Sequence, residues 1–129
     1  AAVVETDLPN DAAEDSYNIL PILLGQPTDQ PIRRYTLQQT MGGRNLSIRR
    51  GNWKYLNHKG SGGNNYDKPM LQPYVLNESE PDAPGQLYHL ENDPGETDNL
   101  YYKHPEIVSE LKSKLDQFIE TGRSAPVRN

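Results

Sequence analysis

The sequence predicts an α+β fold, in which a small antiparallel sheet of three or four strands packs against a C-terminal helix of about residues 105–121. Only 33% of the 129 residues are apolar, and eleven prolines and ten glycines interrupt the chain. This composition is typical of a small sheet with long loops rather than a helical bundle. A period of two residues in the middle of the chain predicts the sheet. An amphipathic stripe near the end of the chain predicts the helix.

Strands are predicted where apolar and polar residues alternate. In the second and third of these segments, Leu46 pairs with Ile48 on one face, and Trp53 pairs with Tyr55. The Gly51-Asn52 pair between them predicts a two-residue hairpin turn, and Gly42-Gly43 predicts a turn before the second segment. The four predicted strand segments are 33–40, 45–50, 53–56 and 86–90.

The C-terminal helix is predicted by an apolar stripe with helical spacing. Pro105 suits its first turn, Glu106 favours the positive end of the helix dipole, and Gly122 provides a C-terminal stop. If the stripe is buried, the sheet must supply the opposite face of the core. The stripe consists of Ile107, Val108, Leu111, Leu115, Phe118 and Ile119.

Two other segments carry less regular structure. Residues 16–25 contain an apolar run that Pro21 interrupts and Gly25 closes, which predicts a short helical turn at most. The stretch 57–85 has no period, and loops beyond about 15 residues are uncommon unless they are functional or disordered.

The acidic loop after the last predicted strand is interpreted as a turn rather than a reaction centre. Asp93-Pro94-Gly95 predicts a turn in which Asp93 caps its own backbone and Gly95 takes a positive φ. Glu96 and Asp98 are then expected beside exposed N–H groups of the next turn. The spacing does not match a calcium-binding EF-hand loop, and a catalytic carboxylate pair needs two rigid elements.

Other classes of function find no support in composition. The formal net charge is −5 without a basic stripe, so nucleic-acid binding is not expected, and no apolar run is long enough to span a membrane. The chain has no cysteine, which excludes disulfides and thiolate metal sites. The spacing of His58, His89 and His104 does not predict that they converge on a metal ion.

Three stretches in the same order resemble the C-terminal end of the sulfatase family, close to arylsulfatase A-type bacterial enzymes. The first is "AAEDSYNILPILLG", and the second is an Arg-x-Gly-x-Trp-Lys segment. The third is "QLYHLENDPGETDNL", which resembles the family pattern L-Y-x-L-x-x-D-P-x-E-x-x-N-L. The matching residues are Arg49, Gly51, Trp53, Lys54, Leu87, Tyr88, Leu90, Asp93, Pro94, Glu96, Asn99 and Leu100.

The resemblance implies a large α/β catalytic domain followed by this smaller unit. Residues 1–26 would form the linker and the end of the catalytic domain, and residues 27–129 the C-terminal sulfatase subdomain. Calcium and a formylglycine nucleophile are expected in the missing catalytic domain, with no cofactor in this chain. The expected partners are the protein's own N-terminal catalytic domain and a sulfated small molecule or glycan. Export to the periplasm or the cell exterior is an expectation from the resemblance only.

This chain is therefore expected to be non-catalytic, supporting the fold and the rim of the substrate pocket. The stretch "SAPVR", Ser124 to Arg128, formally matches the nucleophile motif but lies after a helix instead of leading into one, so it is rejected. The glycine-rich stretch 57–67 is the best candidate for the rim, because glycines admit close approach and polar side chains supply donors. The rim candidates are His58, Lys59, Asn64 and Asn65; the alternative is a plain surface loop.

Two other functions stay open from the sequence. The chain could be a free-standing α+β module that binds a glycan or a protein. It could also be the same subdomain of a phosphonate or phosphodiester hydrolase of the alkaline-phosphatase-like superfold, since fold analogy does not separate sulfate from phosphate chemistry. If a catalytic domain is missing, an apolar patch is expected at Ile19, Leu20, Ile22, Leu23 and Leu24.

Overall fold

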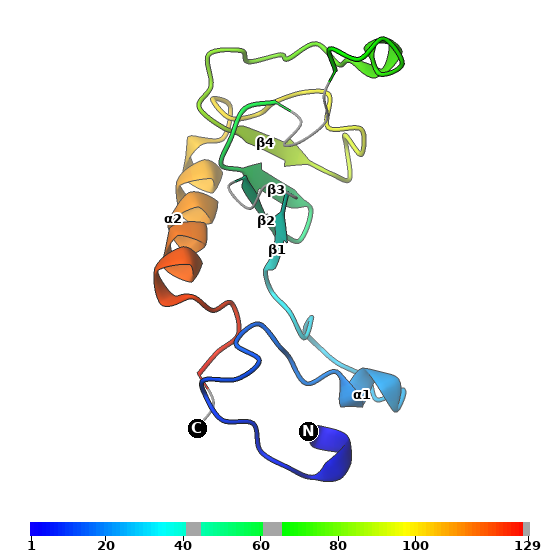
Figure 1. The fold of residues 1–129 in the computed structure, drawn as a ribbon, viewed down its shortest axis with the longest axis vertical. Coiled ribbons are helices and arrows are strands. Elements are labelled where there is room, and N and C mark those ends of the chain that lie inside the picture. The colour runs from blue at the N-terminus through cyan, green and yellow to red at the C-terminus, as the bar shows by residue number, and fades with distance from the viewer. Residues whose placement is uncertain (41–44, 61–65, 128–129) are drawn as a thin grey trace.

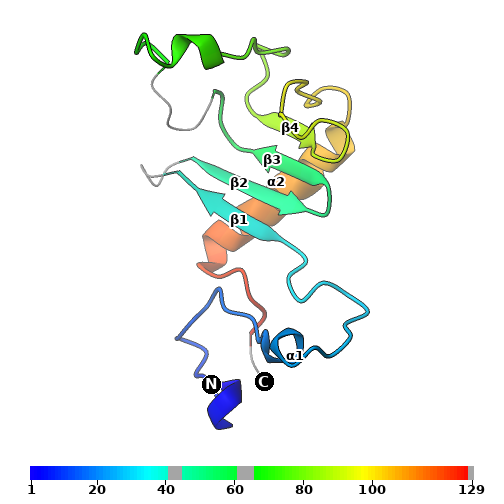
Figure 2. The same cartoon turned by 90° about the vertical axis from the view of Figure 1, so that its right-hand side faces the viewer.

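The computed structural model describes residues 1–40, 45–60 and 66–127 and confirms the predicted α+β architecture (Figure 1). Four antiparallel strands form one sheet in the order β1-β2-β3-β4, and helix α2 (Pro105–Thr121) crosses one face of it (Figure 2). The remaining helical elements are single turns. The strands are β1 (Thr36–Gln39), β2 (Leu46–Arg50), β3 (Trp53–Leu56) and β4 (Gln86–His89), and the short turns are η1 (Ala2–Val4), α1 (Leu20–Leu23) and η2 (Gln72–Tyr74).

The hairpin between β2 and β3 has the predicted two-residue turn. Arg50 pairs with Trp53 across it, and Gly51 takes a φ of 56°, which glycine adopts without a steric penalty. The predicted turn at Gly42-Gly43 lies outside the described residues. Strand β1 is shorter than the predicted segment, although Tyr35 just before it still packs against the core.

The core lies between the sheet and α2. Alternate residues of the strands point toward the helix, as the period of two predicts. Each large apolar side chain buried there contributes about 1.5–3 kcal/mol before entropy is subtracted. The buried cluster consists of Ile48, Tyr55, Leu87, Val108, Leu111 and Leu115.

Helix α2 has the predicted limits, but one residue of its stripe was assigned wrongly. His104 occupies the N-cap position, Pro105 begins the helix, and Gly122 ends it with a φ of 65°. Ile119 was predicted to be buried, yet 54% of its surface is exposed. It follows Phe118 by about 100° around the helix, so Phe118 contacts Tyr35 while Ile119 turns to solvent.

The N-terminal segment is tied to the chain after α2, at the end of the molecule away from β4 (Figure 1). Asp15 Oδ1 accepts hydrogen bonds from the backbone N–H of Ser124 at 2.8 Å and from its hydroxyl at 2.7 Å. Tyr17 donates to the carbonyl of Ser124, and the guanidinium of Arg33 donates to the carbonyl of Asp15. These contacts join the parts of the chain on either side of the predicted division between residues 26 and 27. The division itself stays a prediction.

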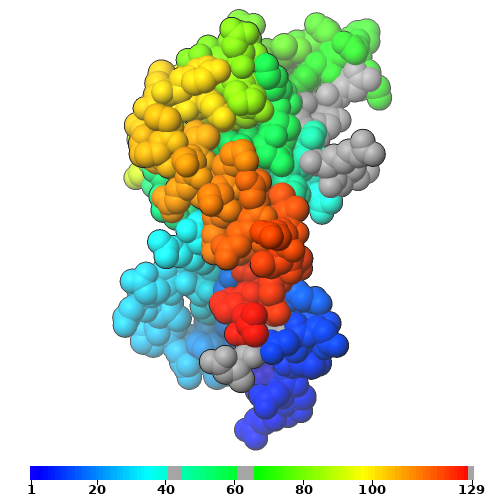
Figure 3. All heavy atoms as spheres, turned by 90° about the vertical axis from the view of Figure 1, so that its left-hand side faces the viewer, coloured from blue at the N-terminus to red at the C-terminus, as the bar shows by residue number. Residues whose placement is uncertain are grey.

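The short helix α1 presents the predicted apolar patch. Four of its five predicted members, Ile19, Ile22, Leu23 and Leu24, are more than half exposed, whereas Leu20 is partly buried. Figure 3 shows that the N-terminal segment forms a lobe beside the end of the chain. In the described parts of the chain, no helix has the length and apolar character needed to cross a membrane.

Candidate functional site

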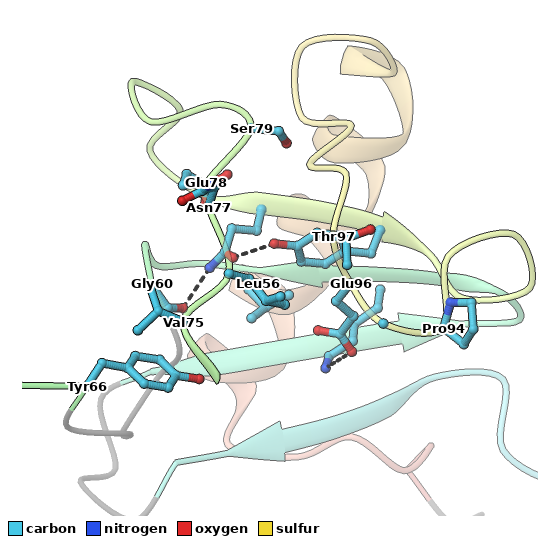
Figure 4. Close-up of a pocket in the computed structure, with 15 residues that line it drawn as sticks. Leu56, Gly60, Tyr66, Val75, Asn77, Glu78, Ser79, Pro94, Glu96 and Thr97 are labelled. Carbon is cyan, nitrogen blue, oxygen red and sulfur yellow. Dashed lines mark hydrogen bonds and ion pairs between the residues drawn. The ribbon is translucent and has the colours of Figure 1, made fainter. Parts of the chain in front are cut away.

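A pocket lies on the face of the sheet opposite to α2. Side chains at alternate positions of β3 and β4 form its floor, because their neighbours in each strand point to the helix. Residues 60, 66 and 75–79 and the acidic loop after β4 form its walls, which enclose about 430 Å³ (Figure 4). The lining residues are Lys54, Leu56, Gly60, Tyr66, Val75, Leu76, Asn77, Glu78, Ser79, Gln86, Tyr88, Pro94, Gly95, Glu96 and Thr97.

Gln86 and Tyr88 of β4 form a buried polar floor. The Tyr88 hydroxyl donates to Gln86 Oε1 at 2.6 Å, and Gln86 Nε2 donates to the carbonyls of His58 and Gly60, both at 2.9 Å. These bonds fix the first residues of the 57–85 stretch over the sheet. Burial raises the pKa of Tyr88, so its phenol stays neutral at physiological pH.

A partly buried ion pair forms one wall of the pocket. Lys54 Nζ lies 2.7 Å from Glu96 Oε1, and the two side chains are 18% and 31% exposed. Glu96 takes a φ of 55°, which is uncommon for a residue with a side chain. The sequence predicted a positive φ at Gly95, and this was wrong, because the chain reverses one residue later.

The acidic loop is held by one carboxylate. Asp93 Oδ2 accepts hydrogen bonds from the backbone N–H groups of Thr97 at 2.7 Å and Asp98 at 2.9 Å. The bond from the Asp98 N–H is the main cause that lowers the pKa of Asp93. Asp93 therefore caps the turn as predicted. Glu96 and Asp98 do not cap it, because they pair with Lys54 and Lys103 instead.

Asn99 joins the pocket wall to the sheet and had no predicted role of its own. Its amide oxygen accepts from the backbone N–H groups of Leu87 and Tyr101, at 3.0 and 3.1 Å. Its amide nitrogen donates to Glu78 Oε1 and to the carbonyl of Gly85, and only 1% of the residue is exposed. The only sequence signal was its place in the quoted motif.

Two of the four predicted rim residues, His58 and Lys59, lie beside this pocket rather than in it. The Lys59 ammonium donates to the carbonyl of Pro81 at 2.8 Å, and His58 Nδ1 lies 3.0 Å from the carbonyl oxygen of Lys59. Neither side chain lines the pocket, although the adjacent Gly60 does. Asn64 and Asn65 lie outside the described residues, so a ligand-binding role for these four residues stays a prediction.

Two histidines that were not predicted to converge meet at Trp53. The rings of His89 and His104 lie edge-on to the indole, with centroid distances of 4.6 and 5.0 Å. Trp53 pairs with His89 across β3 and β4, which explains the first contact. His104 occupies the N-cap position of α2, which explains the second contact. Within residues 1–40, 45–60 and 66–127, no group of three or more histidine or carboxylate side chains could hold a metal ion.

Comparisons with known proteins match the chain to part of a sulfatase. The N-acetylgalactosamine-6-O-sulfatase of Bacteroides thetaiotaomicron is 37% identical over 116 residues, which are 90% of this chain and 21% of that protein. A solved structure, titled for the metabolism of multiple glycosaminoglycans by the same bacterium, is 35% identical with a TM-score of 0.66. The match covers 91% of this chain and 22% of the chain in that structure. No protein-family model matches the chain.

The chain is thus a sulfatase homologue over nearly its whole length, and it spans about a fifth of the relatives that it matches. A match to so small a part of a sulfatase is consistent with the predicted C-terminal subdomain.

Proposed function

We propose that the longer protein hydrolyses sulfate esters of a glycan, and that this chain supports the fold and the substrate-pocket rim without carrying the reaction. The observation that carries the proposal is the 37% identity over 90% of the chain to a named N-acetylgalactosamine-6-O-sulfatase. The solved relative comes from work on glycosaminoglycan metabolism, which supports a glycan as the substrate class.

The state of Ser124 supports a non-catalytic role for this chain. Ser124 is the first residue of the stretch that formally matches the nucleophile motif, and it is buried. Its hydroxyl donates to Asp15, and its backbone is bonded to the N-terminal segment. A hydroxyl that is buried and held by Asp15 in this way joins two parts of the chain. Arg128, the last residue of the motif, lies outside the described residues.

We place the formylglycine and the calcium ion in the catalytic domain. The described residues of this chain do not fit a calcium ion, because no three acidic or histidine side chains gather around a common point. In particular, the acidic loop uses its carboxylates for backbone hydrogen bonds and for lysine pairs. We therefore derive no catalytic step through the metal from this part of the protein.

The partner of this subdomain is the protein's own catalytic domain, and the apolar patch on α1 is the surface that we assign to it. Ile19, Ile22, Leu23 and Leu24 are exposed together, and apolar surface of this kind is stabilised when a partner covers it. About four fifths of the matched sulfatase lies outside the aligned part, so its length accommodates such a partner.

The test is to incubate the full-length protein with N-acetylgalactosamine 6-O-sulfate and, separately, with the corresponding 6-phosphate. Release of sulfate from the first substrate, at a rate well above release of phosphate from the second, is the expected result. Faster phosphate release would contradict the proposal and favour a phosphoester hydrolase of the same superfold.

A further inference from the structure

The pocket over β3 and β4 has the size and chemistry of a small-molecule site, and its charge restricts what it can bind. Its volume of about 430 Å³ lies within the range of ligand pockets, about 300–1,000 Å³. Of its lining side chains, Lys54 is cationic, and Glu78 and Glu96 are anionic. Because Lys54 is neutralised by Glu96, the negative charge of Glu78 is left in excess.

This charge disfavours a sulfate group in the pocket. Glu78 is exposed, and placing a second anion beside it is unfavourable where the nearby cation already has a partner. The pocket instead offers hydrogen-bond acceptors, which hydroxyl groups of a sugar can satisfy. Carbon surface for the ring comes from Leu56, Val75 and Tyr66 (Figure 4). Tyr88 also lines the pocket, from its floor.

One polar group on the wall is available for a ligand. Asn77 is exposed, and its amide has no hydrogen-bond partner within the part of the chain that the structure describes. Its neighbours are already committed: Glu78 accepts from Asn99, and the Ser79 hydroxyl accepts from the Asn99 backbone. Because these bonds hold the wall to the sheet, Asn77 is presented by a fixed stretch of backbone.

We propose that this pocket binds an unsulfated, uncharged sugar unit of the substrate, with Asn77 as a specificity-determining contact and the negative lining discriminating against a sulfated unit. The inference rests on the proposed function for its ligand class. It adds that the subdomain recognises the neighbour of the sulfated unit and not the sulfate.

The experiment measures calorimetric binding of N-acetylgalactosamine and of its 6-O-sulfate to the full-length protein, with the catalytic site occupied by saturating inorganic sulfate. We expect the wild type to bind the neutral sugar more tightly than the sulfated one. Asn77→Ala should weaken neutral-sugar binding by roughly threefold to tenfold, the effect of one lost hydrogen bond. Asn92→Ala, an exposed asparagine outside the pocket, should leave it unchanged.

A second variant tests the charge argument. Glu96→Gln keeps the shape of the side chain and removes one negative charge. It should therefore lower the ratio of the affinity for the neutral sugar to the affinity for the sulfated sugar. Equal binding by the wild type and Asn77→Ala, or an unchanged preference in Glu96→Gln, would overturn the inference. Absence of neutral-sugar binding would do the same. Because binding is measured without turnover, failure of the proposed sulfatase activity would show separately, as absence of sulfate release.

Discussion

At the scale of single residues, Asn99 carries more of the site than any side chain that the sequence singled out. It is buried and satisfies two backbone N–H groups and one carbonyl, while also holding Glu78 in the pocket wall. Removing the amide would leave these groups without partners in a buried place, which costs about 1–3 kcal/mol for each unsatisfied group.

Asn99→Ala is therefore expected to lower the free energy of unfolding by roughly 3 kcal/mol or more, because three backbone groups lose their partner. Urea denaturation of the 129-residue chain measures it, with Asn92→Ala as the control because Asn92 is exposed. A loss in Asn99→Ala no larger than in the control would refute the role given to this amide.

The link between Asp15 and Ser124 predicts a dependence on pH. The hydrogen bonds from Ser124 lower the pKa of Asp15 from its ordinary value of 3.8. A carboxyl with a depressed folded pKa stabilises the protein above its unfolded pKa, and the stabilisation is lost as the pH falls through the folded value. The wild type should thus be more stable than Asp15→Asn at pH 7. The difference in stability should shrink as the pH falls below about 4 and vanish below the folded pKa of Asp15.

Unfolding free energies of both proteins between pH 7 and pH 2.5 provide the measurement for this link. Asp82→Asn, at an exposed position, is the matched control. A constant difference between Asp15→Asn and the wild type across this range would show that ionised Asp15 does not stabilise the join between the two segments.

At the scale of elements, the sequence predicted the sheet and the helix well because their signals are local. The alternation around Ile48 and Tyr55, the Gly51-Asn52 turn and the stripe through Leu111 each depend on neighbours within a few residues. The pocket could not be predicted in this way. Its parts come from β3, β4, the 57–85 stretch and the acidic loop, and no local pattern shows that they meet.

The same reasoning explains what the sequence missed or assigned wrongly at single positions. Contact between Trp53 and His104 brings together residues far apart in the chain, and the positive φ of Glu96 accompanies its pairing with Lys54. Ile119 belongs to the apolar stripe by spacing, but the opposing surface contacts Phe118 instead. Such details depend on tertiary partners, which spacing alone does not specify.

A prediction at the level of elements concerns the pairing of β3 with the start of β4. A Cβ atom at Gly85 would lie 2.7 Å from the carbonyl oxygen of Leu56, which is too close for a real contact. Gly85→Ala should therefore force the two backbones apart and destabilise the chain by roughly 1–3 kcal/mol. Thermal unfolding measures the effect, and Gly95→Ala is the control because its nearest neighbours are side-chain atoms at 3.3 Å or more. Equal midpoints for the two variants would contradict this account.

Packing of α2 gives a second prediction at this level. Leu111 is fully buried and Ile119 is 54% exposed, although both belong to the same apolar stripe. Leu111→Ala should cost about 2–5 kcal/mol of stability, and Ile119→Ala much less. Denaturant titration of the two variants decides the matter, and similar losses would mean that Ile119 is buried after all.

At the scale of the whole molecule, the sheet and α2 form one body, and the N-terminal segment with its exposed α1 lies at the opposite end from the pocket (Figure 1). We expect this apolar end to bind the dye ANS when the 129-residue chain is alone. The double variant Ile22→Glu and Leu23→Glu should lose most of that fluorescence without a change in far-ultraviolet circular dichroism. Unchanged fluorescence in the variant would place the dye, and the apolar surface, elsewhere.

We propose that this chain is the non-catalytic C-terminal subdomain of a sulfatase. The most direct test compares sulfate release from N-acetylgalactosamine 6-O-sulfate by the full-length protein and by the 129-residue chain at equal concentrations. We expect turnover by the full-length protein and none above background by the chain. Turnover by the chain alone would contradict it, because the nucleophile would then lie within these residues.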